Sequence, residues 1–409
     1  MGNRIGNYIK GTDHRYLLAC IGSSIFAVVV LCSIGYKQLG GLATDEISGE
    51  VIGLGGYRRA VVQGAVSVLG VILAVILSKI KYRDLANLWP MHAALCWGLV
   101  LPTLVLHNVS IGPVTIGFDA GGTDNYSWYK IGGFTFQPTE LAKISFILTF
   151  ALHLYHERDR LNEPLKLIGL LLHLIAPILL IHKQGDDGTA IIYGFIGACM
   201  LFCAGLAWRY ILAAVTVAVA GGGAAFFFFS DKIGKSYQWT RIMAVIDPNN
   251  TTGWAATEQF YKDTVLQQAS GELAIGSGRI FGQGLFTQEY VYVPNAYNDF
   301  VFSWIGNAVG FVGAGIVLVV LFYICGRALA TGLRSNDTLG CYICVGVAAA
   351  MFAQIVVNLG MNLRVLPVIG VTLPFYSAGG SSVIMLYLCV GLVLSVYMNQ
   401  EKGLFASDL

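Results

Sequence analysis

Charged residues are scarce in this sequence. Asp, Glu, Lys and Arg make up 12% of the 409 residues, whereas soluble domains carry about 25%. The 25 basic and 23 acidic residues leave a net charge of +2, so the concentrated positive charge of nucleic-acid-binding proteins is missing. Disordered chains combine low hydrophobicity with high net charge, and here 56% of the residues are hydrophobic. The class that remains is an integral membrane protein with several spans.

Several familiar site signatures are also missing. The phosphate-binding pattern GxxxxGK[ST] and the zinc pattern HExxH do not occur. All nine cysteines fall within or at the ends of apolar stretches, which argues against a disulfide framework in the long loops. Cys341 and Cys344 form a CxxC pair without a second pair, and we interpret them as small packing residues.

Ten continuous apolar stretches are each long enough to cross a membrane as a helix. They cover roughly residues 16–36, 59–78, 85–106, 138–155, 164–182, 188–206, 210–229, 300–325, 339–361 and 380–398. Transmembrane β-strands are excluded because the stretches do not alternate between apolar and polar residues. We therefore predict an all-α, polytopic fold of about ten transmembrane helices, with residues 1–409 forming a single membrane domain.

Lys and Arg in the short connections predict the orientation of this domain. They gather before the first stretch and at 79–83, 158–166 and 327–334. This side is therefore predicted to be cytoplasmic, together with both termini. The long loops 37–58, 107–137, 230–299 and 362–379 are then extracytoplasmic.

The largest of these loops, residues 230–299, has a helical pattern in its middle. Apolar residues recur there at helical spacing: Trp254, Tyr261, Val265, Ala269 and Leu273. The spacing predicts an amphipathic helix that lies on the membrane surface.

Charges inside the spans are the informative residues, because each costs on the order of 2.5–3.5 kcal/mol at the bilayer centre. In the segment 136–143, Gln137 and Pro138 open a predicted helix, and Pro138 suits its first turn. Glu140 and Lys143 follow three residues apart, so they can pair. They form either a structural ion pair or the lining of a cavity that binds an anion.

Two further segments combine polar residues with breaks in the helical pattern. Gln184 and Asp186 precede a helix that begins at about Gly188, where a carboxylate caps the helix or lines a site. Residues 366–382 form a broken or re-entrant segment, because such backbone is tolerated only where it is buried or lines a cavity. Its candidate cavity residues are Pro367, Pro374, Gly379, Gly380 and Ser381.

The end of the large loop contains the remaining candidates. Gly276, Ser277 and Gly278 belong to a glycine-rich run, which allows close backbone approach and offers N–H groups to an oxyanion. Arg241 and Arg279 could clamp a phosphate. Asp299 directly precedes an apolar span, where it is either a helix cap or a base with a raised pKa.

Taken together, these motifs resemble the SEDS family (shape, elongation, division and sporulation), which includes RodA, FtsW and SpoVE. The resemblance covers nearly the whole chain, and any one motif alone is weak. The matching segments are FQPTELAK at 136–143, Gln184–Asp186 with Gly188–Ala190, RIMAVIDP at 241–248, AIGSGRIFGQGL at 274–285, VPNAYNDFVFSWIGNAVGFVG at 293–313 and LPVIGVTLPFYSAGGSS at 366–382.

The resemblance implies a peptidoglycan glycosyltransferase of the bacterial cytoplasmic membrane, with its active site on the outer side. Its substrate would be lipid II, a disaccharide-peptide on undecaprenyl pyrophosphate, and its partner a class B penicillin-binding protein. The reaction inverts an α-linked donor to a β-1,4 product, with Asp299 as the catalytic residue. We assign Lys143, Arg241 and Arg279 to the pyrophosphate, with Mg²⁺ or Mn²⁺ as a candidate cofactor and none required by the sequence.

Some positions depart from the family pattern, which indicates a divergent member. Asn295 and Tyr297 stand where the family has an acidic residue and a histidine, and Asn307 and Ala308 replace two glutamates. Two alternatives therefore stay open. One is a flippase for a lipid-linked precursor, since transporters also contain broken helices. The other is a catalytically weak scaffold that activates a penicillin-binding protein.

Overall fold

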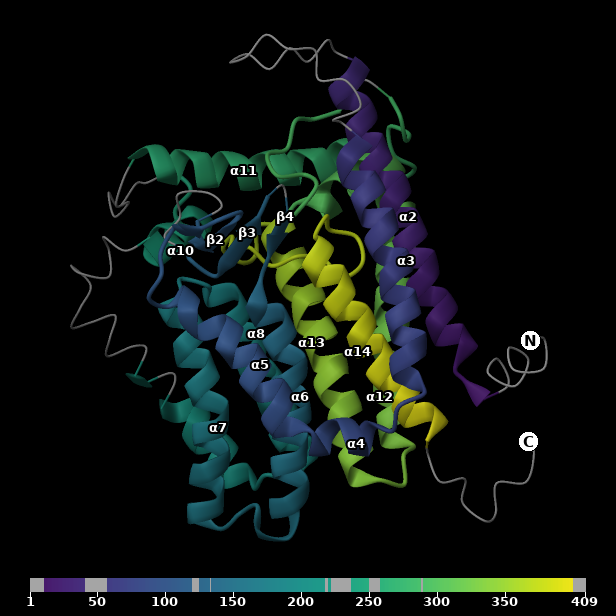
Figure 1. The fold of residues 1–409 in the computed structure, drawn as a ribbon. Coiled ribbons are helices and arrows are strands. Elements are labelled where there is room, and N and C mark those ends of the chain that lie inside the picture. Colours follow the sequence, from purple (N-terminus) through teal and green to yellow (C-terminus); the bar gives the residue numbers. More distant parts are fainter. Residues whose placement is uncertain are drawn as a thin grey trace.

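The computed structural model describes residues 11–40, 57–119, 125–132, 134–217, 220–221, 237–249, 258–287 and 290–399. Its long helices run side by side as one bundle (Figure 1). They are α2 (His14–Gly40), α3 (Arg58–Ser78), α5 (Trp89–Thr103), α6 (Pro138–Glu157), α7 (Pro164–Lys183), α8 (Asp187–Cys203), α12 (Val301–Leu333), α13 (Thr338–Asn362) and α14 (Gly380–Met398). The prediction of an all-helical membrane bundle is confirmed.

The described helices overlap the predicted stretches, although not all are of full membrane length. Six of the described helices, namely α2, α3, α7, α12, α13 and α14, are long and apolar enough to span a membrane. The stretch at 85–106 contains the short α4 (Tyr82–Asn87) followed by α5. The helix α8 and a helix at Trp208–Val217 are apolar but shorter than a full span, and part of the 210–229 stretch lies outside the described residues.

The two ends of the bundle differ in character. At one end, Arg327 Nε donates to Asp13 Oδ2 at 3.0 Å, and Arg83 Nη2 lies 3.2 Å from Asp337 Oδ1. These ion pairs tie the start of α2 to α12 and the start of α4 to the start of α13. The opposite end contains a sheet, two surface helices and an irregular segment at 363–379 (Figure 1). The basic connections thus lie together at one end, as the orientation rule requires.

A four-stranded antiparallel sheet occupies the 107–137 loop, which the all-helical prediction did not include. Its strands are β1 (Val109–Ile111), β2 (Val114–Phe118), β3 (Trp128–Ile131) and β4 (Phe134–Phe136), in that order. The register between β2 and β3 shifts at Gly117, where φ is +62° and an added Cβ would lie 2.0 Å from the Leu106 carbonyl oxygen. Only glycine fits this bulge. The strands are three to five residues long, too short for the period of a strand to stand out in the sequence.

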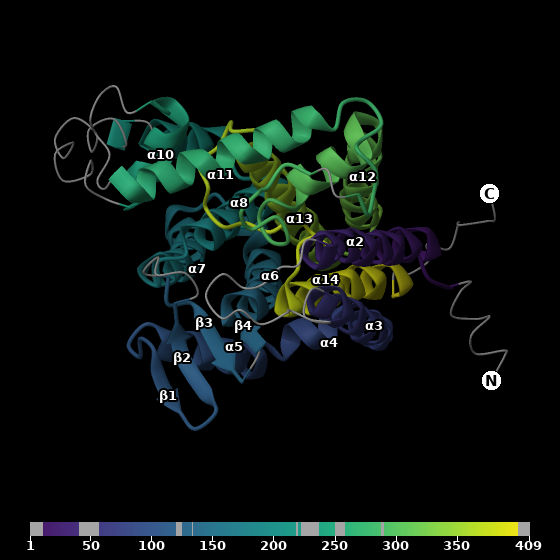
Figure 2. The same cartoon turned by 90° about the horizontal axis from the view of Figure 1, so that it is seen from above.

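Two helices cover this end of the bundle, α10 (Tyr237–Ile246) and α11 (Glu258–Ser277). Figure 2 shows α11 crossing above the bundle. The predicted helix is therefore confirmed, but its predicted apolar row does not match the residues that are buried. Tyr261, Thr264 and Gln268 are buried, whereas Leu273 is 63% exposed. Trp254 lies outside the described residues.

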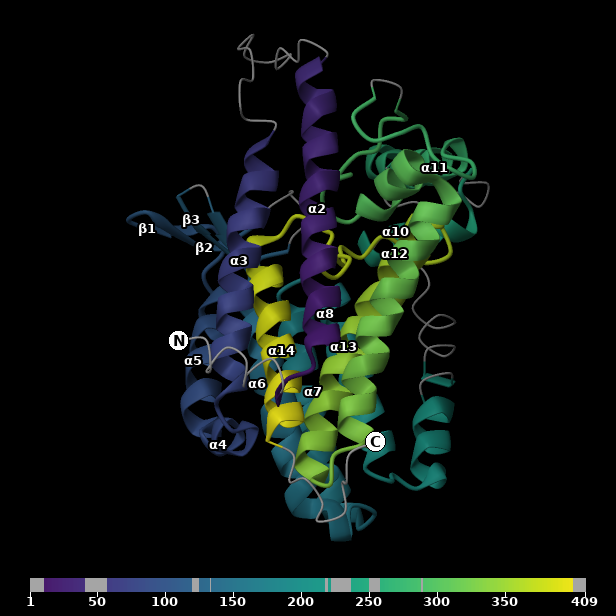
Figure 3. The same ribbon diagram turned by 90° about the vertical axis from the view of Figure 1, so that its right-hand side faces the viewer.

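The helix α12 breaks at Gly310, where φ is +67°. The backbone of the loop after α11 packs against this break. Phe311 N donates to Arg279 O at 2.8 Å, and Gln283 N donates to Asn307 O at 2.9 Å. Figure 3 shows α12 beside α2 along the bundle. A Cβ at Gly310 would lie 2.3 Å from the Gly282 nitrogen, so both the dihedral angle and the space require glycine there.

We expect Gly310→Ala to destabilise the protein by about 1–3 kcal/mol or more, because it combines left-handed backbone with a backbone clash. The matched control is Gly315→Ala on the same helix, where an added Cβ meets nothing within 4 Å. Since alanine favours helix, this control should be neutral or stabilising. Thermal unfolding of both variants in detergent measures the difference, and equal midpoints would contradict the assignment.

Candidate active site

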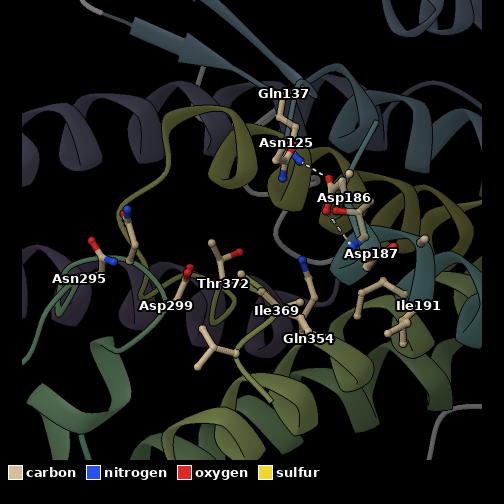
Figure 4. Close-up of a pocket in the computed structure, with 18 of the residues that line it drawn as sticks. Asn125, Gln137, Asp186, Asp187, Ile191, Asn295, Asp299, Gln354, Ile369 and Thr372 are labelled. Atoms are coloured by element: carbon tan, nitrogen blue, oxygen red, sulfur yellow. Dashed lines mark hydrogen bonds between the residues drawn. The ribbon is translucent and has the colours of Figure 1, made fainter. Parts of the chain in front are cut away.

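A cavity of about 1380 Å³ lies at the sheet-bearing end of the bundle. Figure 4 shows Asp299 and Asp186 on opposite sides of this cavity, with Thr372 and Gln354 between them. The structure brings most of the predicted site residues to its wall. These are Gln137, Glu140, Lys143, Asp186, Arg241, Asp299, Pro367, Gly379, Gly380 and Ser381.

Asp299 is positioned through its backbone rather than as a helix cap. Its carbonyl oxygen accepts from Asn358 Nδ2 at 2.8 Å and from Asn362 Nδ2 at 2.9 Å. Both asparagines come from α13, and both are fully buried. Sequence reasoning missed them, although two amides four residues apart in an apolar span are themselves an expensive signal.

The carboxyl group of Asp299 faces the cavity and is partly exposed. Burial raises the pKa of Asp299 to about 6, and the positive charge of Arg241 on α10 opposes this rise. Such a pKa suits a general base that works near neutral pH, because the group is mostly ionised but still basic.

Lys143 and Glu140 form the predicted pair on the first turns of α6. Lys143 Nζ donates to Glu140 Oε1 at 2.7 Å, and the two residues are 5% and 8% exposed. Because both also line the cavity, the pair is structural and is available to a ligand at the same time.

Gln137 joins the sheet-side wall to the start of α8. Its Nε2 donates to Asp186 Oδ2 at 2.5 Å, and Asp186 Oδ1 accepts from Thr189 N at 3.1 Å. The capping interpretation of Asp186 is therefore correct, and the same residue also lines the cavity. Gln184 is instead buried away from the cavity, where its Nε2 donates to Val100 O at 3.2 Å.

The neighbouring dyad of His182 and Asp187 was not among the predicted residues. His182 Nδ1 and Asp187 Oδ1 are hydrogen-bonded, and both residues line the cavity. The sequence does contain a carboxylate next to Asp186, but only the turn at Gly185 brings it against the histidine five positions earlier.

The irregular segment after α13 confirms the predicted re-entrant backbone. Its polar groups bind side chains from other helices, since Gln63 Nε2 donates to Phe375 O at 3.0 Å and Gln268 Nε2 donates to Leu366 O at 2.9 Å. Asn358 Nδ2 also donates to Val371 O, at 2.8 Å. These bonds allow non-helical backbone to form part of the cavity wall.

Several predicted residues are not in the cavity wall. Gly276, Ser277, Gly278 and Arg279 lie at the end of α11, where the glycine run packs on the backbone of α12. A Cβ at Gly278 would be 2.0 Å from Gly306 O, so the predicted close approach is real. However, Gly276 and Ser277 belong to α11 and Gly278 N donates to Ile275 O at 3.3 Å, so the N–H group of Gly278 is not offered to an oxyanion.

Two of the predicted prolines, Pro138 and Pro374, lie outside the wall of the main cavity. Pro138 is buried at the first position of α6, as its sequence context predicts. Pro374 lines a small neighbouring pocket that also touches Glu140 and Lys143. Among the described residues, no group of three or more His, Cys, Asp or Glu side chains could hold a metal ion. We therefore derive no step through a metal.

The comparisons with known proteins agree with this geometry. The family described as "Cell cycle protein", FtsW/RodA/SpoVE, matches residues 48–402. The chain belongs to this family. Probable peptidoglycan glycosyltransferase FtsW of Geobacter metallireducens is 30% identical over 97% of this chain and 96% of its own length. Peptidoglycan glycosyltransferase MrdB of Escherichia coli K12 is 31% identical over 87% of this chain and 88% of its own.

Solved structures also resemble this FtsW/RodA/SpoVE fold. A chain of a peptidoglycan synthase complex that coordinates polymerization and crosslinking has a TM-score of 0.66 and 26% identity, and the match covers 93% of this chain and 98% of that one. RodA of Thermus thermophilus has a TM-score of 0.56 and 25% identity, with 93% and 97% coverage.

The residues that depart from the FtsW/RodA/SpoVE pattern have defined contacts here. Asn307 Nδ2 donates to Ala274 O at 3.1 Å, which ties α12 to α11. The ring of Tyr297 lies 3.6 Å from the guanidinium carbon of Arg59, a cation–π contact that joins the Asp299 turn to α3. Asn295 lines the cavity. Asn307 and Tyr297 therefore join the segment around Asp299 to α11 and α3.

We expect Asn358→Ala to lower the free energy of unfolding by about 1–3 kcal/mol, because Val371 O loses its side-chain donor while Asp299 O keeps only that of Asn362. Val356→Ala is the matched control, since Val356 lies on the same helix and is 40% exposed. Thermal unfolding should separate the two variants clearly. An Asn358→Ala midpoint close to that of the control would show that these bonds do not hold the Asp299 turn.

Proposed function

We propose that this protein is a peptidoglycan glycosyltransferase that polymerises lipid II into glycan strands at the outer face of the bacterial cytoplasmic membrane. Its membership of the FtsW/RodA/SpoVE family supports the class of reaction. The observation that carries the proposal is the cavity, whose lining includes Asp299, Lys143 and Arg241. A base and two cations in one pocket are the groups that this transfer needs.

The transfer itself is a displacement at the anomeric carbon of the donor sugar. The acceptor 4-hydroxyl attacks this carbon, Asp299 takes the hydroxyl proton, and the bond between the carbon and the pyrophosphate oxygen breaks. The departing oxygen keeps the electron pair. Because attack comes from the side opposite the leaving group, the α-linked donor gives a β-1,4 product.

The leaving pyrophosphate needs positive charge close to it. Lys143 and Arg241 line the cavity and are our candidates. Glu140 pairs with Lys143 at 2.7 Å and competes with an anion for it, so Arg241 contributes the stronger attraction in this proposal. The predicted contribution of Arg279 is withdrawn because its side chain does not line the cavity.

The setting of the cavity supports a lipid-linked substrate. It lies at the end of the bundle opposite the basic connections, which the orientation rule assigns to the outside. Apolar residues of α8 and α7, among them Ile191 and Leu179, line it beside the polar groups. A polyprenyl chain can contact these residues while the sugars contact the polar wall. As partner we propose a class B penicillin-binding protein, in keeping with the synthase complex that this fold resembles.

Replacing the proposed base should abolish polymerisation. We expect Asp299→Asn to lower the rate on labelled lipid II by at least about 10²-fold, because the amide cannot accept the hydroxyl proton. Asp159→Asn is the control, since this side chain is 88% exposed at the basic end. Glycan chains are measured on gels with the purified, folded protein and its partner.

The same assay separates the alternatives. A flippase would move lipid II across vesicles and make no glycan with either variant. A scaffold would make no glycan itself and would activate its partner equally well with Asp299→Asn. Either outcome would contradict the proposed catalytic role.

The rate should depend on pH through the ionisation of Asp299. Because the base acts when deprotonated and its pKa is about 6, we expect kcat/KM to fall about tenfold per pH unit below that value and to level off above it. Arg241 lowers this pKa, so Arg241→Gln should move the acid limb to higher pH. Arg279→Gln removes the same charge outside the cavity and should leave the limb in place. If Arg241→Gln and Arg279→Gln have the same acid limb, Arg241 does not influence the pKa of Asp299 and this prediction is wrong.

A further inference from the structure

The sheet at the cavity end is amphipathic, although the Phe118–Trp128 pair adds two aromatic side chains to the face of Lys130. Residues paired across neighbouring strands point to the same face. One face is apolar and consists of two cross-strand rows: Val109, Ile116, Tyr129 and Phe136 form an inner row, and Ile111, Val114, Ile131 and Phe134 form an outer row. The opposite face has the row Ser110, Thr115, Lys130 and Thr135.

The inner apolar row packs on the bundle. Tyr129 is 8% exposed, and its Oη donates to Leu99 O of α5 at 2.8 Å. Phe136 packs against the main hydrophobic core. The apolar face is therefore directed toward α5, the helix that leads into the sheet. Since the polar row includes Thr135, which lines the cavity, that row is directed toward the cavity side.

The outer apolar row has no cover within the described residues. Ile111 is 61% exposed, Ile131 47% and Phe134 62%. Figures 2 and 3 show β1 and β2 extending sideways past α5, away from α11. The outer row therefore lies beyond the edge of the bundle, on the same face that packs on α5 further in.

The exposed row is continuous with a surface that meets lipid. The last turns of α5 and the residues after it expose Leu101 at 48% and Val105 at 79%, and β1 begins four residues after Val105. In a multi-pass membrane protein, this apolar side of α5 faces acyl chains. A sheet that starts where the helix ends lies at the level of the lipid headgroups, and its apolar face looks back toward the membrane.

We infer that this sheet is a membrane-surface anchor, whose outer row Ile111, Val114, Ile131 and Phe134 dips into the boundary between headgroups and acyl chains. An amphipathic element binds such a boundary by burying its apolar face while its polar face stays in water. Exposed to water, the same row would be an apolar patch next to the substrate cavity. When it is anchored in lipid, the sheet fixes the distance between the membrane and one part of the cavity wall. That part includes Trp128 and Thr135.

Tryptophan substitution on the two faces tests this inference. Ile111→Trp and Phe134→Trp place the reporter on the outer row, and Ser110→Trp places it one residue away on the polar face. The full chain is reconstituted in phosphatidylcholine nanodiscs with or without lipid brominated near the headgroup end of the acyl chains. The signal is the emission of each variant minus that of the parent, which has seven tryptophans.

We expect brominated lipid to quench the added emission of Ile111→Trp and Phe134→Trp, and aqueous iodide to quench that of Ser110→Trp. Phe134→Trp retains an aromatic side chain, so it serves as the test if Ile111→Trp does not fold. If iodide quenches both outer-row reporters and brominated lipid does not, the row faces water and the inference is wrong. That result would be expected of a face that binds a partner protein absent from the nanodisc.

Discussion

Every backbone polar group in the interior of a membrane bundle must find a partner within the protein, and the cavity wall depends on this constraint. Residues 363–379 are not helical, so only some of their carbonyl and N–H groups satisfy one another along the chain, as Tyr376 N does with Leu373 O. Three buried amide side chains replace the missing bonds. Gln63 comes from α3, Gln268 from α11 and Asn358 from α13, so three separate helices hold one irregular segment.

The same amides connect the irregular wall to the candidate base. Asn358 binds Val371 O in the wall and Asp299 O in the opposite turn, so one side chain fixes both sides of the site relative to each other. Asn362 adds a second bond to Asp299 O, and its Oδ1 accepts from Ser303 N at 3.0 Å. Because these bonds hold the backbone, the carboxyl group of Asp299 remains directed to the cavity, where burial alone is sufficient to raise its pKa.

Electrostatic interactions in the site follow from which charges are paired. Glu140 and Lys143 neutralise each other within one helix, so the pair can be buried at little net cost. Asp186 is stabilised by the start of α8 and by Gln137. These two groups shape the wall, and Arg241 supplies charge from α10, an element outside the bundle. The sheet, α10 and α11 therefore complete a site for which the bundle provides the floor.

The sequence by itself determined the membrane class, the positions of most helices and several residues that line the cavity, including Asp299, Lys143, Glu140, Asp186 and Arg241. Glu140 and Lys143 were readable because charged residues in an apolar stretch are costly and so stand out, whereas Asp299 and Arg241 were found in the long loop through motifs. The tertiary structure alone decided which of them meet. It showed that the run from Gly276 to Arg279 packs on α12, that Leu273 faces outward, and that Asn358 and Asn362 hold Asp299. Contacts between distant segments depend on how whole helices pack, and no local period or spacing encodes that packing.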